Sequence, residues 1–148
     1  MRWIHDVSTD PADPPLFVAL RETRQQCANG VDYSGLKTDE HCKRYPELQT
    51  VIFTQAPAQV FNAALTAANA LGWKIAASVE SEGRIEATAV TRVFRFKDDV
   101  VIRVRSKNGR TLLDTRSASR VGESDLGANA KRISIFLRLT GANLNAHR

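Results

Sequence analysis

An Asn-Gly pair at residues 108 and 109 constrains the fold of this 148-residue chain more than any other feature. Both residues tolerate positive φ, which a two-residue hairpin turn requires, and alternating apolar residues flank them on each side. A turn at this position sets Lys107 opposite Arg110 and fixes every pair beyond them. The sequence therefore predicts an antiparallel hairpin, in which a slip of one residue would exchange the two faces.

The predicted register sorts the side chains of this hairpin onto two chemically different faces. The core-directed face grades from apolar to polar away from the turn, with the pairs Val104–Leu113, Ile102–Thr115, Val100–Ser117 and Asp98–Ser119. The opposite face holds the pairs Arg103–Asp114, Val101–Arg116, Asp99–Ala118 and Lys97–Arg120, with Arg105 diagonal to Asp114. Arginines outnumber acids on this second face, so solvent, the N-terminal segment or a bound anion must neutralise the surplus.

The rest of the chain from residue 48 alternates between strand and helix patterns. A strand at 51–53 is followed by a helix that begins near Pro57 and ends at Gly72, and by strands over 73–79, 85–89, 100–104 and 110–121. We expect a bulge around residues 90–93 and a turn at 97–99. A final helix follows, with Ser124 as its cap, Asp125 at its positive end and an apolar stripe that includes Leu126.

This order, β-α-β-β-β-β-α, predicts an α+β fold. Two helices pack on one face of a curved antiparallel sheet, and the other face is left to solvent or to a partner. The order is similar to the TATA-binding-protein-like or helix-grip topology, an analogy that carries no function. Four of the five prolines precede residue 47, so we expect residues 1–47 to form an irregular arm that wraps the core and residues 48–148 to form a single α+β domain.

Composition excludes several functional classes. Lys and Arg total 21 against 16 Asp and Glu, which allows an anionic partner or a merely basic surface. The chain lacks P-loop, GxGxxG, HExxH and GxSxG motifs, so no catalytic residue and no cofactor is predicted. Cys27 and Cys42 form no CxxC pair, and His41 has no second ligand at metal spacing, so no metal site is predicted. A disulfide between the two cysteines remains open. Nucleic acid is not predicted as a partner, because aromatic residues that could stack on bases are few.

The polar residues of the last hairpin admit two interpretations. In one, an anion such as a phosphate, a carboxylate or a lipid headgroup binds to a set of basic and hydroxyl side chains. Those candidates are Arg103, Arg116, Ser117, Ser119, Arg120 and Arg132. In the other, the arginines form a salt-bridge lattice with neighbouring strands and with Asp6, Asp10 and Asp13 of the arm. The polar network expected to support either arrangement consists of Asp98, Asp99, Asp114, Asp125 and Asn129.

The run FRFKDDVVIRVR…LDTRSASRVGESDLGANAKRI, with its RSxSRxGxSDxGxN core, resembles the domain-of-unknown-function family 1499. Asp13-Pro14-Pro15 and Tyr45-Pro46 are similar to its bacterial members. The resemblance covers nearly the whole chain and implies no established activity. Bacterial members often carry an upstream hydrophobic segment, which implies membrane association or export. No apolar run here approaches the ~20 residues that span a bilayer, so we expect a soluble chain, periplasmic or membrane-associated if such a segment precedes Met1.

Three functional hypotheses follow. The leading one is a non-catalytic binding or envelope-associated accessory module with an Arg-rich, anion-compatible polar cluster. The second is a carboxylate- or metal-dependent enzyme of hydrolase type that uses Asp98, Asp99, Asp114 or Asp125. The third is a protein-interaction module that uses the open sheet face.

Overall fold

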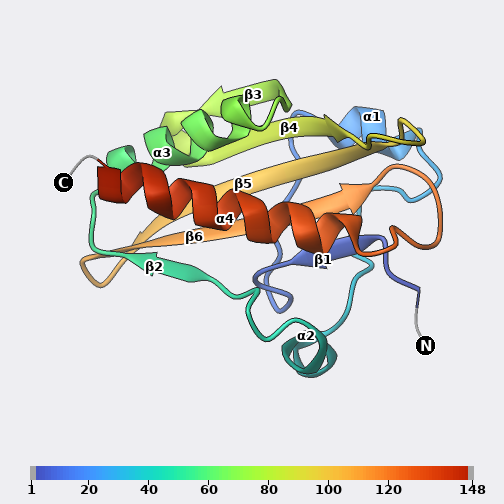
Figure 1. Cartoon of the computed structure of the whole chain (residues 1–148), viewed down its shortest axis with the longest axis horizontal. Helices are drawn as coiled ribbons and strands as arrows, with labels where there is room; N and C mark the ends of the chain where they lie inside the picture. Colours follow the sequence, from blue (N-terminus) through green and yellow to red (C-terminus); the bar gives the residue numbers. More distant parts are fainter. Residues whose placement is uncertain (1–2, 147–148) are drawn as a thin grey trace.

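The computed structural model describes residues 3–146. Its elements are listed here in chain order (Figure 1): β1 (Asp6–Ser8), α1 (Arg21–Gln25), α2 (Thr38–Arg44), β2 (Val51–Phe53), α3 (Pro57–Ala70), β3 (Lys74–Val79), the 3₁₀ turn η1 (Glu80–Glu82), β4 (Arg84–Val90), β5 (Lys97–Lys107), β6 (Arg110–Ser119) and α4 (Ala128–Ala146). The predicted α+β order is confirmed from β2 to α4. The segment expected to be irregular contains β1 and two short helices, whose weak local patterns gave no clear signal.

The hairpin register is confirmed from Lys107–Arg110 to Asp98–Ser119, and beyond the end of β6 the amide of Arg120 donates to the carbonyl of Lys97 at 3.1 Å. Asn108 and Gly109 adopt φ values of 52° and 75°, as a type I′ turn requires. Lys107 lies opposite Arg110, and the register then continues without a shift to Asp98 opposite Ser119. The two faces of the hairpin therefore carry the side chains that the sequence assigns to them.

Strand β6 organises the remainder of the sheet, whose order is β1-β6-β5-β4-β3. Its free edge pairs with two separate segments: β1 lies beside residues 116–118 and β2 beside residues 111–113, both antiparallel. β1 was not predicted, because Asp6-Val7-Ser8 lacks the β-branched and aromatic run that identified β2. Its position brings Asp6 directly beside the Arg-rich end of β6.

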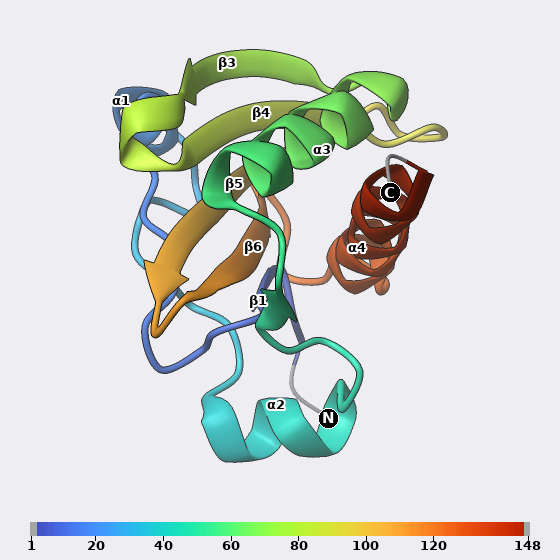
Figure 2. The ribbon, with the colours of Figure 1, turned by 90° about the vertical axis from the view of Figure 1, so that its left-hand side faces the viewer.

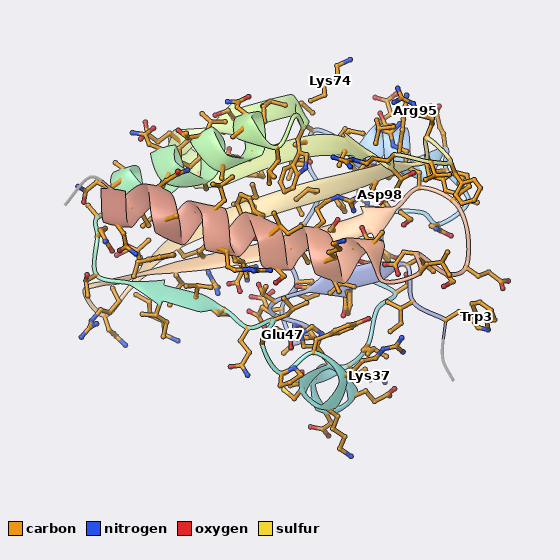
Figure 3. The ribbon with its side chains drawn as sticks, in the orientation of Figure 1. Trp3, Lys37, Glu47, Lys74, Arg95 and Asp98 are labelled. Atoms are coloured by element: carbon orange, nitrogen blue, oxygen red, sulfur yellow. The ribbon has the colours of Figure 1, made fainter. Side chains whose placement is uncertain are left out.

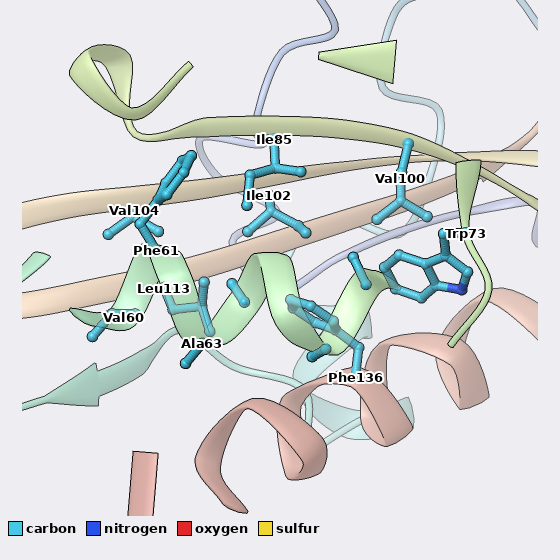
Figure 4. Packing of buried hydrophobic residues seen from close by; sticks show 14 of the residues in the cluster. Val60, Phe61, Ala63, Trp73, Ile85, Val100, Ile102, Val104, Leu113 and Phe136 are labelled. Atoms are coloured by element: carbon cyan, nitrogen blue, oxygen red, sulfur yellow. The ribbon is translucent and has the colours of Figure 1, made fainter. Parts of the chain in front are cut away.

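Helices α3 and α4 cover one face of the sheet and enclose the main hydrophobic core (Figure 4). The alanine-rich face of α3 lies close to the strands, with Ala64 and Ala67 fully buried. Trp73 stacks on Phe136 of α4 at a centroid distance of 5.3 Å, which joins the helix layer to the end of β3. This is the two-helix layer that the sequence predicts.

The second face of the sheet is not open, which corrects the expectation that it faces solvent or a partner. Residues 9–36 run across it, so that the sheet lies between this segment and the two helices (Figure 2). Phe17 and Leu20 pack against Val101 and Ala118 in a separate buried cluster. The sequence predicted an arm that wraps the core, but not the sheet face on which Phe17 and Leu20 pack.

Three local predictions in the second half were wrong. Lys97 to Asp99 do not form a turn, because β5 already begins at Lys97 and the connection from β4 occupies residues 91–96 instead of a bulge. The final helix begins at Ala128, and the carboxylate of Asp125 accepts hydrogen bonds from the amides of Gly127 (2.7 Å) and Asn129 (3.3 Å). Asp125 therefore caps the helix in place of Ser124, whose hydroxyl accepts from the amide of Leu126.

Within residues 3–146, no helix combines the length and the apolar character needed to cross a bilayer.

Candidate functional site

Arg116 lies at the centre of a buried polar lattice on the arm side of the sheet, with 1% of its surface exposed. Its Nε and Nη2 donate to the two carboxylate oxygens of Asp6 at 3.0 and 2.9 Å. Nη1 donates to the carbonyl of Pro15 and Nη2 to that of Val31, while the guanidinium lies 4.8 Å from the ring centroid of Phe17. The arm thus surrounds this side chain with acceptors and aromatic surface.

Asp99 forms a second centre of the lattice. Its carboxylate accepts from Arg24 Nη1 at 2.9 Å, from the hydroxyl of Thr88 at 2.8 Å, and from Nε and Nη2 of Arg120 at 3.0 Å. Hydrogen bonds to Asp99 raise the pKa of Arg120 above its ordinary value. Arg24 is itself buried and also donates to the carbonyls of Ala118 and Gly30, so α1 is held against the sheet by one guanidinium.

Asp114 and Glu86 complete the lattice. Asp114 accepts from the hydroxyls of Thr9 (2.8 Å) and Thr50 (2.5 Å), and its other oxygen lies 3.2 and 3.3 Å from the guanidinium nitrogens of Arg103 and Arg105. Arg103 also pairs with the arm carboxylates, 3.2 Å from Asp10 and 3.8 Å from Asp13.

The fully buried carboxylate of Glu86 in β4 binds the arm through its backbone. It accepts hydrogen bonds from three consecutive amides, those of Val18, Ala19 and Leu20, at 2.7–3.1 Å. Arg84 pairs with the same carboxylate from two positions earlier on the strand. Sequence reasoning missed Glu86 and Arg24, because nothing local to either residue reveals a partner 66 or more positions away.

A different polar cluster lies on the helix side of the sheet, beneath the start of α4. Ser117 donates to the Oδ1 of Asn129 at 2.6 Å, and the Nδ2 of Asn129 donates to Ser119 at 3.0 Å and to Asp125 at 2.8 Å. Arg132 Nη1 donates to Ser117 and Asn129 and lies 2.8 Å from Oδ2 of Asp98. The adjacent residues Asp98 and Asp99 therefore serve opposite faces, as strand geometry requires.

The structure thus divides the predicted site residues into two groups. Arg103, Arg116 and Arg120 lie on the arm side with Asp99 and Asp114, while Ser117, Ser119 and Arg132 lie on the helix side with Asp98, Asp125 and Asn129. The contacts of the first group are those that a salt-bridge lattice requires. The role of either group in binding an anion stays a prediction.

One end of the molecule exposes an apolar surface that sequence reasoning did not identify. It is formed by the 91–96 loop, the 121–127 loop and the segment before β1, and it comprises Trp3, Val93, Phe94, Phe96, Val121 and Leu126, here called the apolar tip. Phe94 is 67% exposed and stacks on Phe96 at 5.6 Å, and Leu126 is 85% exposed at a φ of 53°. Trp3 and Arg95 both lie at this end (Figure 3). In the sequence, the apolar–polar alternation of the strand breaks after Val90, and this break was the available signal for the loop.

Two hollows join the parts of the apolar tip. A cavity of about 330 Å³ between the loops is lined by Phe94, Phe96, Val121 and Leu126, with Asp98 and Ser119 also in its lining. A second cavity, of about 570 Å³, is lined by Trp3, Ile4, Arg44 and residues 124–127. Leu126 lines both cavities, so the surface continues from Trp3 to the 91–96 loop.

The described part of the chain contains neither a metal-binding cluster nor a disulfide. Across residues 3–146, no group of three or more His, Cys, Asp or Glu side chains is arranged to hold a metal ion. Cys27 and Cys42 are separate thiols, which settles the open question of a disulfide. The Nε2 of His41 lies 2.7 Å from the carbonyl of Leu48, so this ring connects α2 to the chain entering β2.

Comparison with solved structures gives a likeness in fold. The crystal structure of Ara h 8.0201 aligns with a TM-score of 0.51 at 12% identity, over 66% of this chain and 95% of that one. The crystal structure of TTHA0849 from Thermus thermophilus aligns over the same shares at 8% identity with a TM-score of 0.39. The first agrees with a curved antiparallel sheet and packed helices, and at this identity it speaks for the fold alone.

Comparison of the sequence gives a family. No curated protein matches the chain. The family model described as "Protein of unknown function (DUF1499)" matches residues 6–139, which include β1, the complete lattice and most of α4. The chain therefore belongs to the DUF1499 family.

Proposed function

We propose that this protein is a non-catalytic, envelope-associated accessory module that docks on an anionic lipid surface through its apolar tip. The observation that carries the proposal is the apolar tip itself: six large apolar side chains, each at least 46% exposed, gathered on two loops and the segment before β1. Large exposed apolar patches mark interaction surfaces, because leaving them in water is unfavourable.

The composition of the apolar tip suits a membrane interface. Trp is favoured at the boundary between headgroups and acyl chains because its indole has an apolar body and an N–H donor, and Phe and Leu are common on the apolar face of segments that lie in this boundary. The side chains of Trp3 and Phe94 are both exposed and therefore available to such a boundary. The apolar tip therefore offers the residue types that enter the interface without crossing it.

Charge supports an anionic surface as the partner. Arg92, Arg95 and Lys97 are exposed on the 91–96 loop and at the start of β5, among the apolar side chains. The opposing acids are the exposed Glu123 and the half-buried Asp125, and Asp125 is engaged at the start of α4. Each Lys or Arg close to an anionic leaflet contributes about 1 kcal/mol of attraction.

The arginines of the last hairpin support the proposal indirectly. Arg116 and Arg103 are held by carboxylates, and Arg120 is held by Asp99, so binding an anion there would require displacement of an existing ion pair. A buried pair resists such exchange because its partner would be left uncompensated. We therefore assign the anion-compatible role to the loop residues Arg92 and Arg95.

Vesicle binding tests this proposal. We expect the protein to co-sediment with vesicles that contain phosphatidylglycerol and to bind pure phosphatidylcholine more weakly. Phe94→Ser or Leu126→Ser should weaken binding about ten-fold or more, since each removes a large side chain from the interface. Ile52→Ser, at an exposed site on β2, is the matched control. Arg95→Gln should weaken binding to anionic vesicles but not to phosphatidylcholine vesicles. Arg110→Gln, at the hairpin turn, is its control and should bind both as the parent protein does. Equal effects of the tip and control variants would contradict the proposal.

Substitutions of Leu126 should change both the stability of the fold and the binding to vesicles. A bulky residue in the left-handed region costs about 1 kcal/mol, which asparagine largely avoids. We expect Leu126→Asn to raise the free energy of unfolding by about 0.5–1 kcal/mol and to weaken vesicle binding. Leu126→Ala should weaken binding without this gain, because alanine retains the strain. Chemical denaturation measures the first effect, and a destabilised Asn variant would contradict it.

A further inference from the structure

Asp98 differs from every other buried acidic side chain that the structure describes. Asp6, Glu86, Asp99 and Asp114 each accept at least three hydrogen bonds from amides, hydroxyls or guanidinium groups. Asp98 is 1% exposed, and its only described partner is Arg132, 2.8 Å from Oδ2 in a contact without hydrogen-bond geometry. A carboxylate has about four acceptor positions, and leaving them empty in a buried site is costly.

The side chain of Asp98 adjoins a cavity. Asp98 and Ser119, which are cross-strand neighbours, line the cavity of about 330 Å³, whose remaining wall is largely apolar. Ser119 accepts from Asn129, and among residues 3–146 its hydroxyl proton has no described acceptor. The cavity lies within the ~300–1,000 Å³ range of small-molecule sites. An acceptor and a donor therefore meet at the polar end of an apolar hollow.

The charges around this hollow select the type of head group. Arg132 already compensates Asp98, and Arg92 also lines the cavity, so a cationic ligand would meet an unfavourable field. An anionic head would lie against the carboxylates of Asp98 and Asp125. A neutral hydroxyl avoids both conflicts: it can donate to Asp98 and accept from Ser119.

We infer that this cavity is a binding site for an uncharged amphiphile, whose hydroxyl head bonds to Asp98 and Ser119 and whose apolar body lies between Phe94, Val121 and Leu126. The site goes beyond the proposed docking on lipid, because it takes a single molecule and requires no bilayer. The two residues were predicted in different roles, Asp98 in a supporting polar network and Ser119 in an anion site, and here they share one ligand.

Three probes that differ only in the head group test the inference in solution. Titration of the full chain with 1-octanol, octylammonium and octanoate, followed by amide chemical shifts, should show 1-octanol binding at least ten-fold more tightly than either ion. The shifts should map to residues 91–98 and 119–128. The inference would be overturned if 1-octanol did not bind, or if either ion bound as tightly. This outcome does not depend on the result of the vesicle-binding experiment.

Two variants assign the head-group contacts. Ser119→Ala should weaken 1-octanol binding several-fold or more, whereas Ser106→Ala removes an exposed hydroxyl from β5, away from the cavity lining, and should leave binding unchanged. Asp98→Asn should weaken binding about ten-fold or more, because a charged acceptor becomes a neutral one. Melting curves establish that each variant is folded. Equal affinity in Ser119→Ala and the parent protein would contradict the assigned contacts even if Asp98→Asn fails to fold.

Discussion

Replacing Arg116 by alanine is expected to lower the free energy of unfolding by about 3–5 kcal/mol, the usual cost of breaking a buried ion pair. The substitution leaves the Asp6 carboxylate buried with the amide of Ser34 as its remaining described hydrogen-bond donor. It also opens a space between the rings of Phe17 and Tyr33. Urea denaturation measures the change, since the midpoint reports stability when the slope is constant.

Two comparisons make the Arg116 result specific. Arg138→Ala removes an exposed guanidinium from α4 and should change stability by no more than a few tenths of a kcal/mol. Removing both partners, in Asp6→Asn with Arg116→Met, should recover part of the loss, because no buried charge is left uncompensated. A small effect of Arg116→Ala together with lost binding of inorganic phosphate would instead favour an anion site at this position.

Glu86→Gln is the second large expected effect. Three consecutive arm amides donate to this carboxylate, and a neutral amide group offers one acceptor oxygen in place of two. We expect a loss of about 2–4 kcal/mol, because hydrogen bonds to charged groups are stronger than neutral ones. Hydrogen exchange at Val18, Ala19 and Leu20 should accelerate most, since the arm loses its attachment to β4.

Glu82→Gln is the matched control for Glu86. Glu82 also pairs with Arg84, but its side chain is largely exposed and contacts no arm amide. Its replacement should leave exchange at residues 18–20 unchanged. If exchange there were equally slow in Glu86→Gln, the arm would be held by its apolar anchors alone.

The hairpin could be predicted to the residue because its determinants are local. Asn108-Gly109 sets the turn, and the period of two then assigns each side chain to a face. The two helices followed from the same reasoning, since α3 and α4 show apolar stripes at helical spacing. Asp125 replaces Ser124 as the helix cap because two adjacent residues of similar capping preference compete, and local sequence does not decide between them.

The covered sheet face and the apolar tip could not be predicted in the same way. Glu86 and Arg24 depend on partners far away in the sequence, and no periodicity encodes which strand the arm crosses. The start of β5 was placed too late because Lys97-Asp98-Asp99 has the composition of a turn, although Asp98 and Asp99 are buried by partners on opposite faces. The expected bulge over residues 90–93 also concealed Val93, which lies in the exposed loop between β4 and β5.

Trp3 provides the most direct test of docking through the apolar tip. The chain has two tryptophans, of which Trp73 is buried in the core and Trp3 is 66% exposed. In a Trp73→Phe variant, Trp3 becomes the only indole, and brominated acyl chains quench an indole only when it enters the bilayer interface. We predict a blue-shifted, strongly quenched emission with anionic vesicles and little change with phosphatidylcholine alone. An unshifted, unquenched Trp3 on anionic vesicles would contradict the account.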